Sequence, residues 1–580
     1  MNIITNQVEQ LILDQLELEF KYSRNILDDK IWTLVTPDLT SKFSTEQEAK
    51  AFLITVLKNP RGSNIQAFIA CIRAFGFTLE QTINLIEKHS ESGIYELVEH
   101  ESGNITAESV ISLDRGTFRN LTKNITVLPP MLVPPKKWTT SSNGGYLTVK
   151  HNAILGNKNQ HNKYICLHTL NKLQSIGWKL NPTIVSMFSD DTSYAYDKAM
   201  TVTADMLGQD FYFMWQYDKR GRMYSKGYEI NLQSSEYHKA MLDFAVGEKP
   251  TEATIEGLLI GIAEALGHDK KSWLERHNLA LDYINNHTKI VNNELEIEYP
   301  QDCSKILLTK YVEAYYDALE GKTIHTPVAL DCTASGLQCL AVLTGCESTA
   351  KTVNIVNTGN REDVYTWMIE SMNAQLEPEH QIIGKDGRDR AKQALMTYWY
   401  GSEAVPASML NKHQLQAFMN TLGDVFTGPF MFMESASKAW VDKEEFVWTL
   451  PDGHTAVVRV TDKQVSEITL EGATSSFEYE EMVVMPNGNK THIYANIVHS
   501  VDAYVARELV KRCPFQVATI HDSFWTLPSN LPTMKQHFRE IMQEIADSNL
   551  LSDILSQIAD RTIKFNKLGS LNCDGEYMLS

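Results

Sequence analysis

Cysteine is scarce in this sequence and is not arranged for cross-linking or zinc binding. The chain has 580 residues but only 8 cysteines, with no Cys-x-x-Cys pair and no cysteine and histidine cluster at zinc-site spacing. Disulfide-stapled secreted proteins and zinc domains depend on such patterns. We therefore expect reduced thiols and a cytoplasmic protein.

Long hydrophobic runs are also missing. No stretch approaches the roughly 18 consecutive apolar residues that a membrane span requires. Residues 1–6 do not combine a basic region with an apolar one, as a secretory signal does. We expect no membrane partner.

Positive charge is in short supply as well. Lysine and arginine total 53 against 72 aspartates and glutamates, a net charge of −19, which argues against a partner as anionic as nucleic acid. The positive charge is not spread evenly along the chain, however. Residues 218–226 hold four cations and one acid, and residues 385–392 hold four cations and two acids. The surplus acid must therefore lie mostly elsewhere.

The length corresponds to about four domain-sized units. Thr45 and Thr78 each begin a capping-box pattern before an apolar-periodic run, which predicts a helical N-terminal region. A boundary is expected at the proline-dense stretch 128–138, because proline removes backbone donors and holds the chain extended. Helical patterns dominate again from Ser175 to Leu319.

Two turn signals predict a β insertion late in the chain. They are Pro451-Asp452-Gly453 and Pro486-Asn487-Gly488, and they flank β-branched runs such as Val457-Val458-Arg459-Val460.

Three segments far apart in the sequence make chemical sense together. In the first, Leu330-Asp331-Cys332-Thr333-Ala334-Ser335-Gly336, a carboxylate closes a buried strand and small residues follow as the chain turns into a helix. Taken alone, such an aspartate is more often a helix N-cap than a ligand.

The second segment, residues 388–401, predicts a helix that has a cationic face. Arg388, Lys392, Met396 and Tyr400 recur every fourth residue and so share one face. Arginine can fork onto phosphate oxygens and lysine can act as a point charge, which suits a triphosphate lying along the helix. A solvated cationic stripe is the alternative if this helix stands alone.

The third segment, residues 515–527, predicts a hairpin with His521-Asp522 at its tip. A single His-Asp turn is usually structural. Together with Asp331, however, Asp522 supplies the two hard carboxylates that a pair of Mg²⁺ ions needs, with substrate phosphates completing the coordination.

These segments resemble motifs A, B and C of the right-hand polymerases, most closely the single-subunit RNA polymerases of phages and mitochondria. Further segments match that family in the same order: Pro135-Lys136-Lys137-Trp138-Thr139 with Gly144-Gly145-Tyr146, then Asp218-Lys219-Arg220-Gly221-Arg222, Glu362-Asp363-Val364-Tyr365 and Asn496-Ile497-Val498-His499-Ser500. The resemblance extends from about residue 128 to the end.

The resemblance implies an α+β, mostly helical fold with palm, fingers and thumb and a small helical N-terminal domain. The expected parts are a reduced promoter- and RNA-handling domain at 1–127, a linker and thumb/palm entry at 128–245, palm with motif A at 246–350, fingers with motif B at 351–455, a β insertion at the specificity-loop position at 456–494, and palm with motif C and the C-terminal segment at 495–580.

The resemblance also implies roles for individual residues. Asp331 and Asp522, helped by the Cys332 carbonyl, would hold two Mg²⁺ ions, and Lys392 would contact the phosphates and protonate the leaving group. Arg388 would contact the triphosphate, and Tyr400, His499 and Gly336 would contact the ribose. Tyr365 would contact the incoming nucleotide and the template. The template and hybrid would be contacted by Arg220, Arg222 and Lys239.

The implied activity is synthesis of RNA from NTPs on a DNA template. One alternative is a DNA polymerase of the Pol I type, in which a glutamate stands at the position of Gly336 and fills the space of a 2′-hydroxyl. Another is an inactive, polymerase-like DNA-binding subunit, which would lack one of the carboxylates or the lysine.

The sequence departs from the phage members in two regions. Only 127 residues precede Leu128, and the segment at the specificity-loop position contains Glu478, Glu480 and Glu481. We therefore expect a compact, phage-encoded enzyme in the cytoplasm of an infected host. We also expect it to need either a partner, namely a promoter-recognition subunit or a single-stranded-DNA-binding protein, or a melted or single-stranded template.

Overall fold

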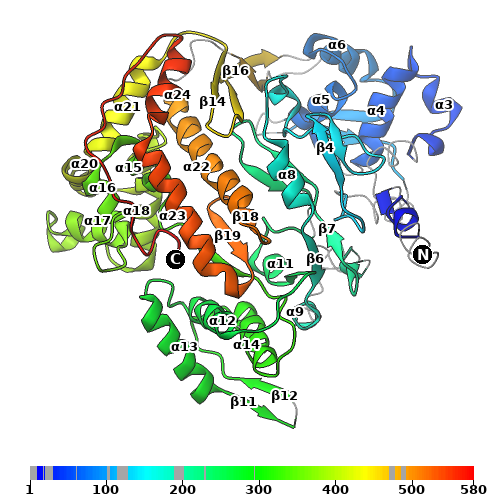
Figure 1. Ribbon diagram of the computed structural model, residues 1–580. Coiled ribbons are helices and arrows are strands. Elements are labelled where there is room, and N and C mark those ends of the chain that lie inside the picture. Colours follow the sequence, from blue (N-terminus) through cyan, green and yellow to red (C-terminus); the bar gives the residue numbers. More distant parts are fainter. Residues whose placement is uncertain are drawn as a thin grey trace. The chain divides into compact units, whose positions relative to one another are not determined.

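The computed structural model of the chain describes residues 10–16, 18–19, 31–59, 62–100, 105–113, 128–187, 202–204, 206–227, 230–292, 294–468, 477–484 and 491–580. Helices and small antiparallel sheets share these residues, so the fold is α+β, as predicted (Figure 1). The chain forms two compact units. The smaller comprises Leu13–Leu128 and Thr461–Met485, and the larger comprises Met1–Ile12, Pro129–Val460 and Pro486–Ser580.

The smaller unit packs helices against a three-stranded sheet. Its helices begin where the capping patterns predict: Thr45 caps α4 by accepting from the Glu48 amide, and Thr78 and Gln81 form a complete capping box on α6. The strands pair in the order β1-β3-β2. The sequence pattern did not predict this sheet, because its strands have only two or five residues. The elements are α3 (Pro37–Thr40), α4 (Glu46–Lys58), β1 (Ser63–Asn64), α5 (Ile65–Arg73), α6 (Leu79–His89), β2 (Tyr95–Glu99) and β3 (Ile105–Ser109).

The region of the predicted β insertion contains two hairpins, and the first of them begins at Glu445, before the predicted bounds of 456–494. The Pro451-Asp452-Gly453 turn joins β14 (Glu445–Thr449) to β15 (Thr455–Arg459), which confirms that turn signal. The second hairpin pairs β16 (Thr461–Ile468) with β17 (Phe477–Val484) and belongs to the smaller unit. The other turn signal, at residues 486–488, lies outside the described residues.

Between residues 177 and 244 the larger unit contains short strands where helices were expected. The prediction was wrong here because each strand has only two to four residues, too few to produce a periodic pattern. These strands are β6 (Gly177–Leu180), β7 (Phe211–Tyr212), β8 (Trp215–Tyr217), β9 (Met223–Ser225) and β10 (Leu242–Phe244), and the other elements before residue 245 are β4 (Lys136–Thr140), β5 (Asn143–Gly145), α8 (Leu167–Gln174), α9 (Pro182–Ser186) and α11 (Glu236–Ala240).

Helices dominate the rest of the larger unit, and three small antiparallel sheets interrupt them. α12 (Glu252–Ala265), α13 (Trp273–His287) and α14 (Lys305–Leu319) precede the strand of the first chemical segment, and β11 (Thr288–Val291) and β12 (Glu294–Ile297) project from them (Figure 1). The remaining elements are β13 (Val328–Asp331), α15 (Ser335–Thr344), α16 (Glu347–Thr352), α17 (Val364–Asn373), α18 (Gly384–Tyr398), α19 (Ala404–Met409), α20 (Lys412–Val425), α21 (Thr427–Ala439), α22 (His492–Arg512), β18 (Ala518–Ile520), β19 (Ser523–Thr526), α23 (Leu531–Asp547) and α24 (Leu550–Ala559).

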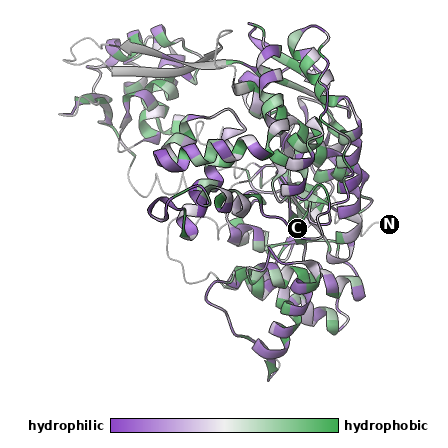
Figure 2. Ribbon diagram, turned by 90° about the vertical axis from the view of Figure 1, so that its left-hand side faces the viewer, coloured by the Kyte–Doolittle hydropathy of each residue, from purple (hydrophilic) through white to green (hydrophobic). Residues whose placement is uncertain are grey.

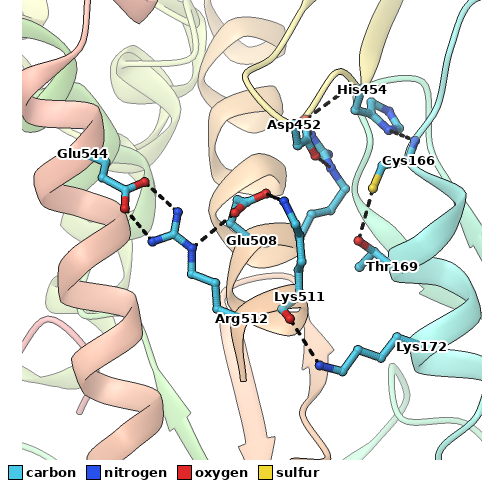
Figure 3. A network of polar contacts seen from close by, with 10 residues as sticks. Cys166, Thr169, Lys172, Asp452, His454, Glu508, Lys511, Arg512 and Glu544 are labelled. Carbon is cyan, nitrogen blue, oxygen red and sulfur yellow. Dashed lines mark hydrogen bonds and ion pairs between the residues drawn. The ribbon is translucent and has the colours of Figure 1, made fainter. Parts of the chain in front are cut away.

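A polar network fixes the C-terminal part of α22 to its neighbours (Figure 3). The Arg512 guanidinium donates to both Glu544 oxygens on α23, at 2.7 and 2.6 Å, and to Glu508 at 3.2 Å. Arg507 is buried and pairs with Asp452, in the turn between β14 and β15, at 2.5 Å. Such bidentate, charge-assisted contacts are directional, so they hold the C-terminal part of α22 against α23 and the turn between β14 and β15.

None of the described helices is long and apolar enough to cross a membrane. The helices of the larger unit mix hydrophobic and hydrophilic residues along their length (Figure 2).

Gly221 occupies a turn that only glycine fits well. Its φ is +92°, and its carbonyl accepts from Arg507 Nη1 at 2.9 Å. A Cβ at this position would meet the Arg507 guanidinium and would lie 2.7 Å from His454 Nε2. Both the backbone conformation and the neighbouring side chains therefore exclude a larger residue.

We predict that Gly221→Ala lowers the free energy of unfolding by about 2 kcal/mol, because it combines positive-φ strain with steric overlap. Urea denaturation followed by circular dichroism measures this loss. Gly321→Ala is the control. Gly321 also has a positive φ, +76°, but no atom lies within 4 Å of the new Cβ. This substitution should therefore lower the free energy of unfolding by only about 1 kcal/mol. Equal losses in the two variants would show that the contacts with Arg507 and His454 do not matter.

Candidate active site

The two predicted metal-binding aspartates lie at the same end of one small sheet. Its strand order is β13-β19-β18, and β13 pairs with β19 so that Asp331 lies opposite Ser523. Asp522 is in the turn just before Ser523, and the Cys332 amide donates to the Asp522 carbonyl at 3.0 Å. The sheet therefore brings together two carboxylates that are 191 positions apart in the sequence.

The turn that carries Asp522 is conformationally unusual. His521 has a φ of +57°, which is uncommon for a residue with a side chain. Backbone strain of this kind persists only where the surrounding structure enforces it, and it concentrates at functional sites. Here the hairpin register on both sides of the turn supplies the constraint, since Ile520 pairs with Ser523.

The electrostatics of Asp331 reflect a crowded acidic site. Asp331 is exposed to the cavity in front of it, yet the surrounding protein and the nearby Asp522 carboxylate raise its pKa above the ordinary value. A hydrogen bond from Ser523 and the charge of Lys239 act in the opposite direction. Lys239, which was expected near the template, thus lies close enough to Asp331 for its charge to act on that carboxylate.

This donor set fits Mg²⁺. Carboxylate and carbonyl oxygens are the ligands that this ion prefers, and it is usually held by one or two carboxylates together with substrate phosphates. Burial and the nearby Asp522 carboxylate both raise the pKa of Asp331, and a divalent cation would favour the charged form of both aspartates. No group of three or more histidine, cysteine, aspartate or glutamate side chains suited to a metal occurs among the described residues, so phosphate oxygens would have to complete the shell.

A cavity of about 200 Å³ opens in front of the two aspartates. Residues of all three chemical segments line it, which the sequence alone could only suggest. The lining residues are Asp331, Cys332, Thr333, Ala334, Ser335, Gly336, Leu337, Tyr365, Lys392, Met396, Trp399, Tyr400 and Asp522. A larger cavity, of about 1100 Å³, lies between α12, α13 and α23 and contains neither aspartate.

The segment after Asp331 leads directly into a helix beside the cavity. The N-cap of α15 is Ala334, so Asp331 does not cap this helix and that alternative is excluded. Gly336 lies in its first turn, where an added Cβ would stand 2.6 Å from the Tyr400 hydroxyl. The missing side chain of Gly336 therefore leaves a space that the Tyr400 hydroxyl partly occupies.

The helix predicted for the second segment is α18, and its cationic face turns toward the cavity. Lys392 is exposed there, with Nζ 5.2 Å from the centre of the Tyr365 ring. Arg388 also lies near that ring but pairs with Asp363 at 2.6 Å. Burial alone would raise the pKa of Asp363, but the contact with Arg388 outweighs it and lowers this pKa to about 2. To bind a triphosphate, Arg388 would have to share or leave this carboxylate.

The Asp-x-x-Gly-Arg element folds around its own aspartate. Asp218 Oδ1 accepts from the amides of Arg220 and Arg222 at 2.8 and 3.0 Å, and Asp218 Oδ2 accepts from Arg220 Nε at 3.0 Å. The Arg220 guanidinium also reaches His499 Nδ1 at 2.6 Å. His499 in turn packs its ring against Tyr400, with centroids 4.6 Å apart.

Asp502 is a site residue that the sequence reasoning missed. It is buried on α22, one turn after His499, and it accepts from Arg222 Nη2 at 2.8 Å and from the Ser335 side chain. Burial raises the pKa of Asp502 to about 6, although Arg222 stabilises its charged form. A carboxylate three positions after a predicted site histidine shares its helix face, and this signal was available in the sequence.

Residues 578–580 extend the sheet on the side of β13 away from β19. Ser580 and Asp331 exchange backbone hydrogen bonds at 2.9 and 3.3 Å, and the Thr333 amide donates to the Met578 carbonyl. Arg276 and Arg361 both donate to the Ser580 hydroxyl at 2.8 Å. These contacts were not predicted, because nothing local in the sequence pairs residues so far apart.

Comparison with known proteins agrees with this arrangement. A family model described as DNA-dependent RNA polymerase matches residues 249–427 and 411–576, which include Asp331, Lys392 and Asp522. The chain is 24% identical to the chloroplastic DNA-directed RNA polymerase 3 of Nicotiana sylvestris over 561 residues, which cover 76% of this chain and 56% of the relative. It is 31% identical to the mitochondrial DNA-directed RNA polymerase of Neurospora crassa over 227 residues, which cover 36% and 16%.

The chain thus spans little more than half the length of the Nicotiana relative. Because the family model covers more than half of the chain itself, the protein belongs to the single-subunit DNA-dependent RNA polymerase family.

Proposed function

We propose that this protein is a DNA-directed RNA polymerase that extends RNA with NTPs on a DNA template. One observation carries the proposal: the two aspartates, Lys392, Tyr400 and Gly336 all line a single cavity of about 200 Å³. Nucleotidyl transfer needs this combination of metal-binding oxygens, a cation for phosphate and a ribose-sized space.

In this mechanism Asp331 and Asp522 would hold two Mg²⁺ ions, and the Cys332 carbonyl would supply a further oxygen ligand. When bound, these ions lower the pKa of the attacking 3′-hydroxyl and neutralise charge on the departing pyrophosphate. The protein's own contribution is positional. Lys392 is exposed on α18 beside both aspartates, where it contacts the phosphates and donates a proton to the leaving group. Tyr365 packs beside Lys392 and supports the nucleotide.

The geometry favours ribonucleotides over deoxyribonucleotides. Gly336 has no side chain to fill the space of a 2′-hydroxyl. Tyr400 lines the cavity and the His499 ring packs against it, and this pair would bind the hydroxyl. A site built to hydrogen-bond a hydroxyl rejects the analogue that lacks it. This supports RNA synthesis over the alternative of a Pol I-type DNA polymerase. Both carboxylates and Lys392 are in place, which argues against an inactive subunit.

We also propose that initiation requires a melted or single-stranded template, or a partner that recognises the promoter. The support is the charge of the chain. Three of the eight residues of β17 are glutamate, and the net charge is −19, which disfavours unaided capture of duplex DNA. The phage origin and the cytoplasmic location expected from the sequence stay predictions.

Asp331→Asn and Asp522→Asn should each reduce RNA synthesis at least about a thousandfold, because loss of a metal-binding oxygen removes several kcal/mol of transition-state stabilisation. Template binding should survive. Primer extension and fluorescence anisotropy measure the two quantities. Asp389→Asn removes an exposed acid from α18 and is the matched control, with activity retained. Substantial elongation by either active-site variant would contradict the two-metal assignment.

The wild-type enzyme should extend an RNA primer with NTPs at least about tenfold better than with dNTPs, as expected when a hydroxyl-binding site is left unsatisfied. Gly336→Ala should reduce NTP use, because the new methyl group displaces the Tyr400 hydroxyl. Values of kcat/KM on one primer–template measure both effects. Equal use of NTPs and dNTPs by the wild type would contradict the proposal.

Run-off synthesis on three templates tests the requirement for melted DNA. With Mg²⁺ and NTPs, we expect product from single-stranded and premelted templates and little from fully duplex DNA, whose capture should weaken steeply with added salt. Equal synthesis from plain duplex would overturn the requirement but would leave the polymerase activity itself intact.

A further inference from the structure

The contact between Arg220 and His499 determines which ring nitrogen of the histidine carries the proton. Arg220 Nη1 lies 2.6 Å from His499 Nδ1. A guanidinium has only donors and does not lose its proton in proteins, whereas a neutral imidazole has one donor nitrogen and one acceptor nitrogen. Nδ1 must therefore accept from Arg220, and the proton of the neutral ring must be on Nε2.

The donor is held firmly in place. Asp218 accepts from Arg220 Nε at 3.0 Å and, through its other oxygen, from two amides of the same turn. The turn is tied to α22, which carries His499, because Arg507 on that helix donates to the Gly221 carbonyl at 2.9 Å. Arg222, in the same turn, also donates to Asp502 on α22 at 2.8 Å, so the elements that carry Arg220 and His499 are joined close to the contact between these two residues.

The surroundings also keep the ring neutral and limit its rotation. Burial, together with the nearby charges of Arg222 and Arg220, lowers the pKa of His499 to about 2. The ring stands at 64° to that of Tyr400, with centroids 4.6 Å apart, so turning the ring over would disturb an aromatic edge contact.

We propose that Arg220 is a positioning residue for ribose recognition: it fixes His499 in the tautomer whose Nε2–H donates a hydrogen bond to the 2′-oxygen of the incoming nucleotide. The inference rests on the proposed polymerase function and adds a requirement to it. The substrate must carry a hydrogen-bond acceptor at the 2′ position, whether or not it can also donate. Arg220 was expected to contact the template or hybrid, and in this structure its guanidinium faces Asp218 and His499.

The first test compares kcat/KM for an NTP and the matching dNTP on one primer–template, so that any change in template affinity cancels. Arg220→Met removes the donor and should lower the NTP:dNTP ratio about tenfold, the worth of one good hydrogen bond. Arg220→Lys keeps a side chain that can only donate hydrogen bonds, so the NTP:dNTP ratio should stay within about threefold of wild type. The ratio for Arg220→Met combined with His499→Ala should equal that for His499→Ala alone, since the arginine acts through the histidine.

Lys219→Met is the matched control. It removes a cation next to Arg220, and no contact of the Lys219 side chain with His499 occurs among the described residues, so the ratio should not change. A wild-type ratio in Arg220→Met, together with a reduced ratio in His499→Ala, would overturn the inference while leaving the polymerase activity standing. Failure of the wild type to incorporate any NTP on a template would instead overturn the proposed function.

A second measurement reads the tautomer directly and does not depend on activity or on the folding of any Arg220 variant. Nitrogen-15 NMR of histidine-labelled wild-type protein, with the His499 signals assigned by their loss in His499→Gln, should show an unprotonated Nδ1 and a protonated Nε2. The opposite pattern, or a doubly protonated ring at neutral pH, would overturn the inference.

Discussion

The antiparallel pairing of β13 with β19 is the constraint on which the rest of the site depends. Its register places Asp331 opposite Ser523, so the Asp522 turn is held at the same end of the sheet. A slip of one residue would turn Asp331 to the other face. Residues 578–580 secure β13 from its other edge. Burial raises the pKa of Asp331, and repulsion by the Asp522 carboxylate held next to it adds to that effect, so the pair favours a divalent cation.

The cations around the cavity fall into two kinds. The arginines are already paired with carboxylates: Arg220 with Asp218, Arg222 with Asp502, and Arg388 with Asp363. An ion pair restrains the planar guanidinium of an arginine, which suits residues that orient other groups. Lys392, by contrast, has no ion pair with a carboxylate among the described residues and is exposed at the cavity. A flexible point charge of this kind can follow phosphates as they shift from substrate to product.

Local sequence patterns predicted the helices and strands that hold the candidate active-site residues. They did not predict the contacts between distant segments. The strand ending at Asp331, the helix of Lys392 and the hairpin of Asp522 all form as predicted. The strands of this sheet have only three or four residues, but a closing carboxylate and a polar turn mark them, and a four-residue repeat marks the helix. The short strands between residues 177 and 244 were not predicted, because two to four residues give no period. The contacts of Asp502 with Arg222 and of Ser580 with Asp331 join distant segments. The local pattern of a single sequence does not show which distant residues pair.

In the proposed mechanism, Asp331 and Asp522 together create a two-ion site once a nucleotide supplies its phosphates. Electron paramagnetic resonance with Mn²⁺ in place of Mg²⁺ tests it directly, on the full chain with template, a 3′-deoxy-terminated primer and the matching NTP. We predict two bound ions for each chain, and weaker binding of both ions in Asp331→Asn and in Asp522→Asn. Ion binding that is unchanged by either substitution would contradict it.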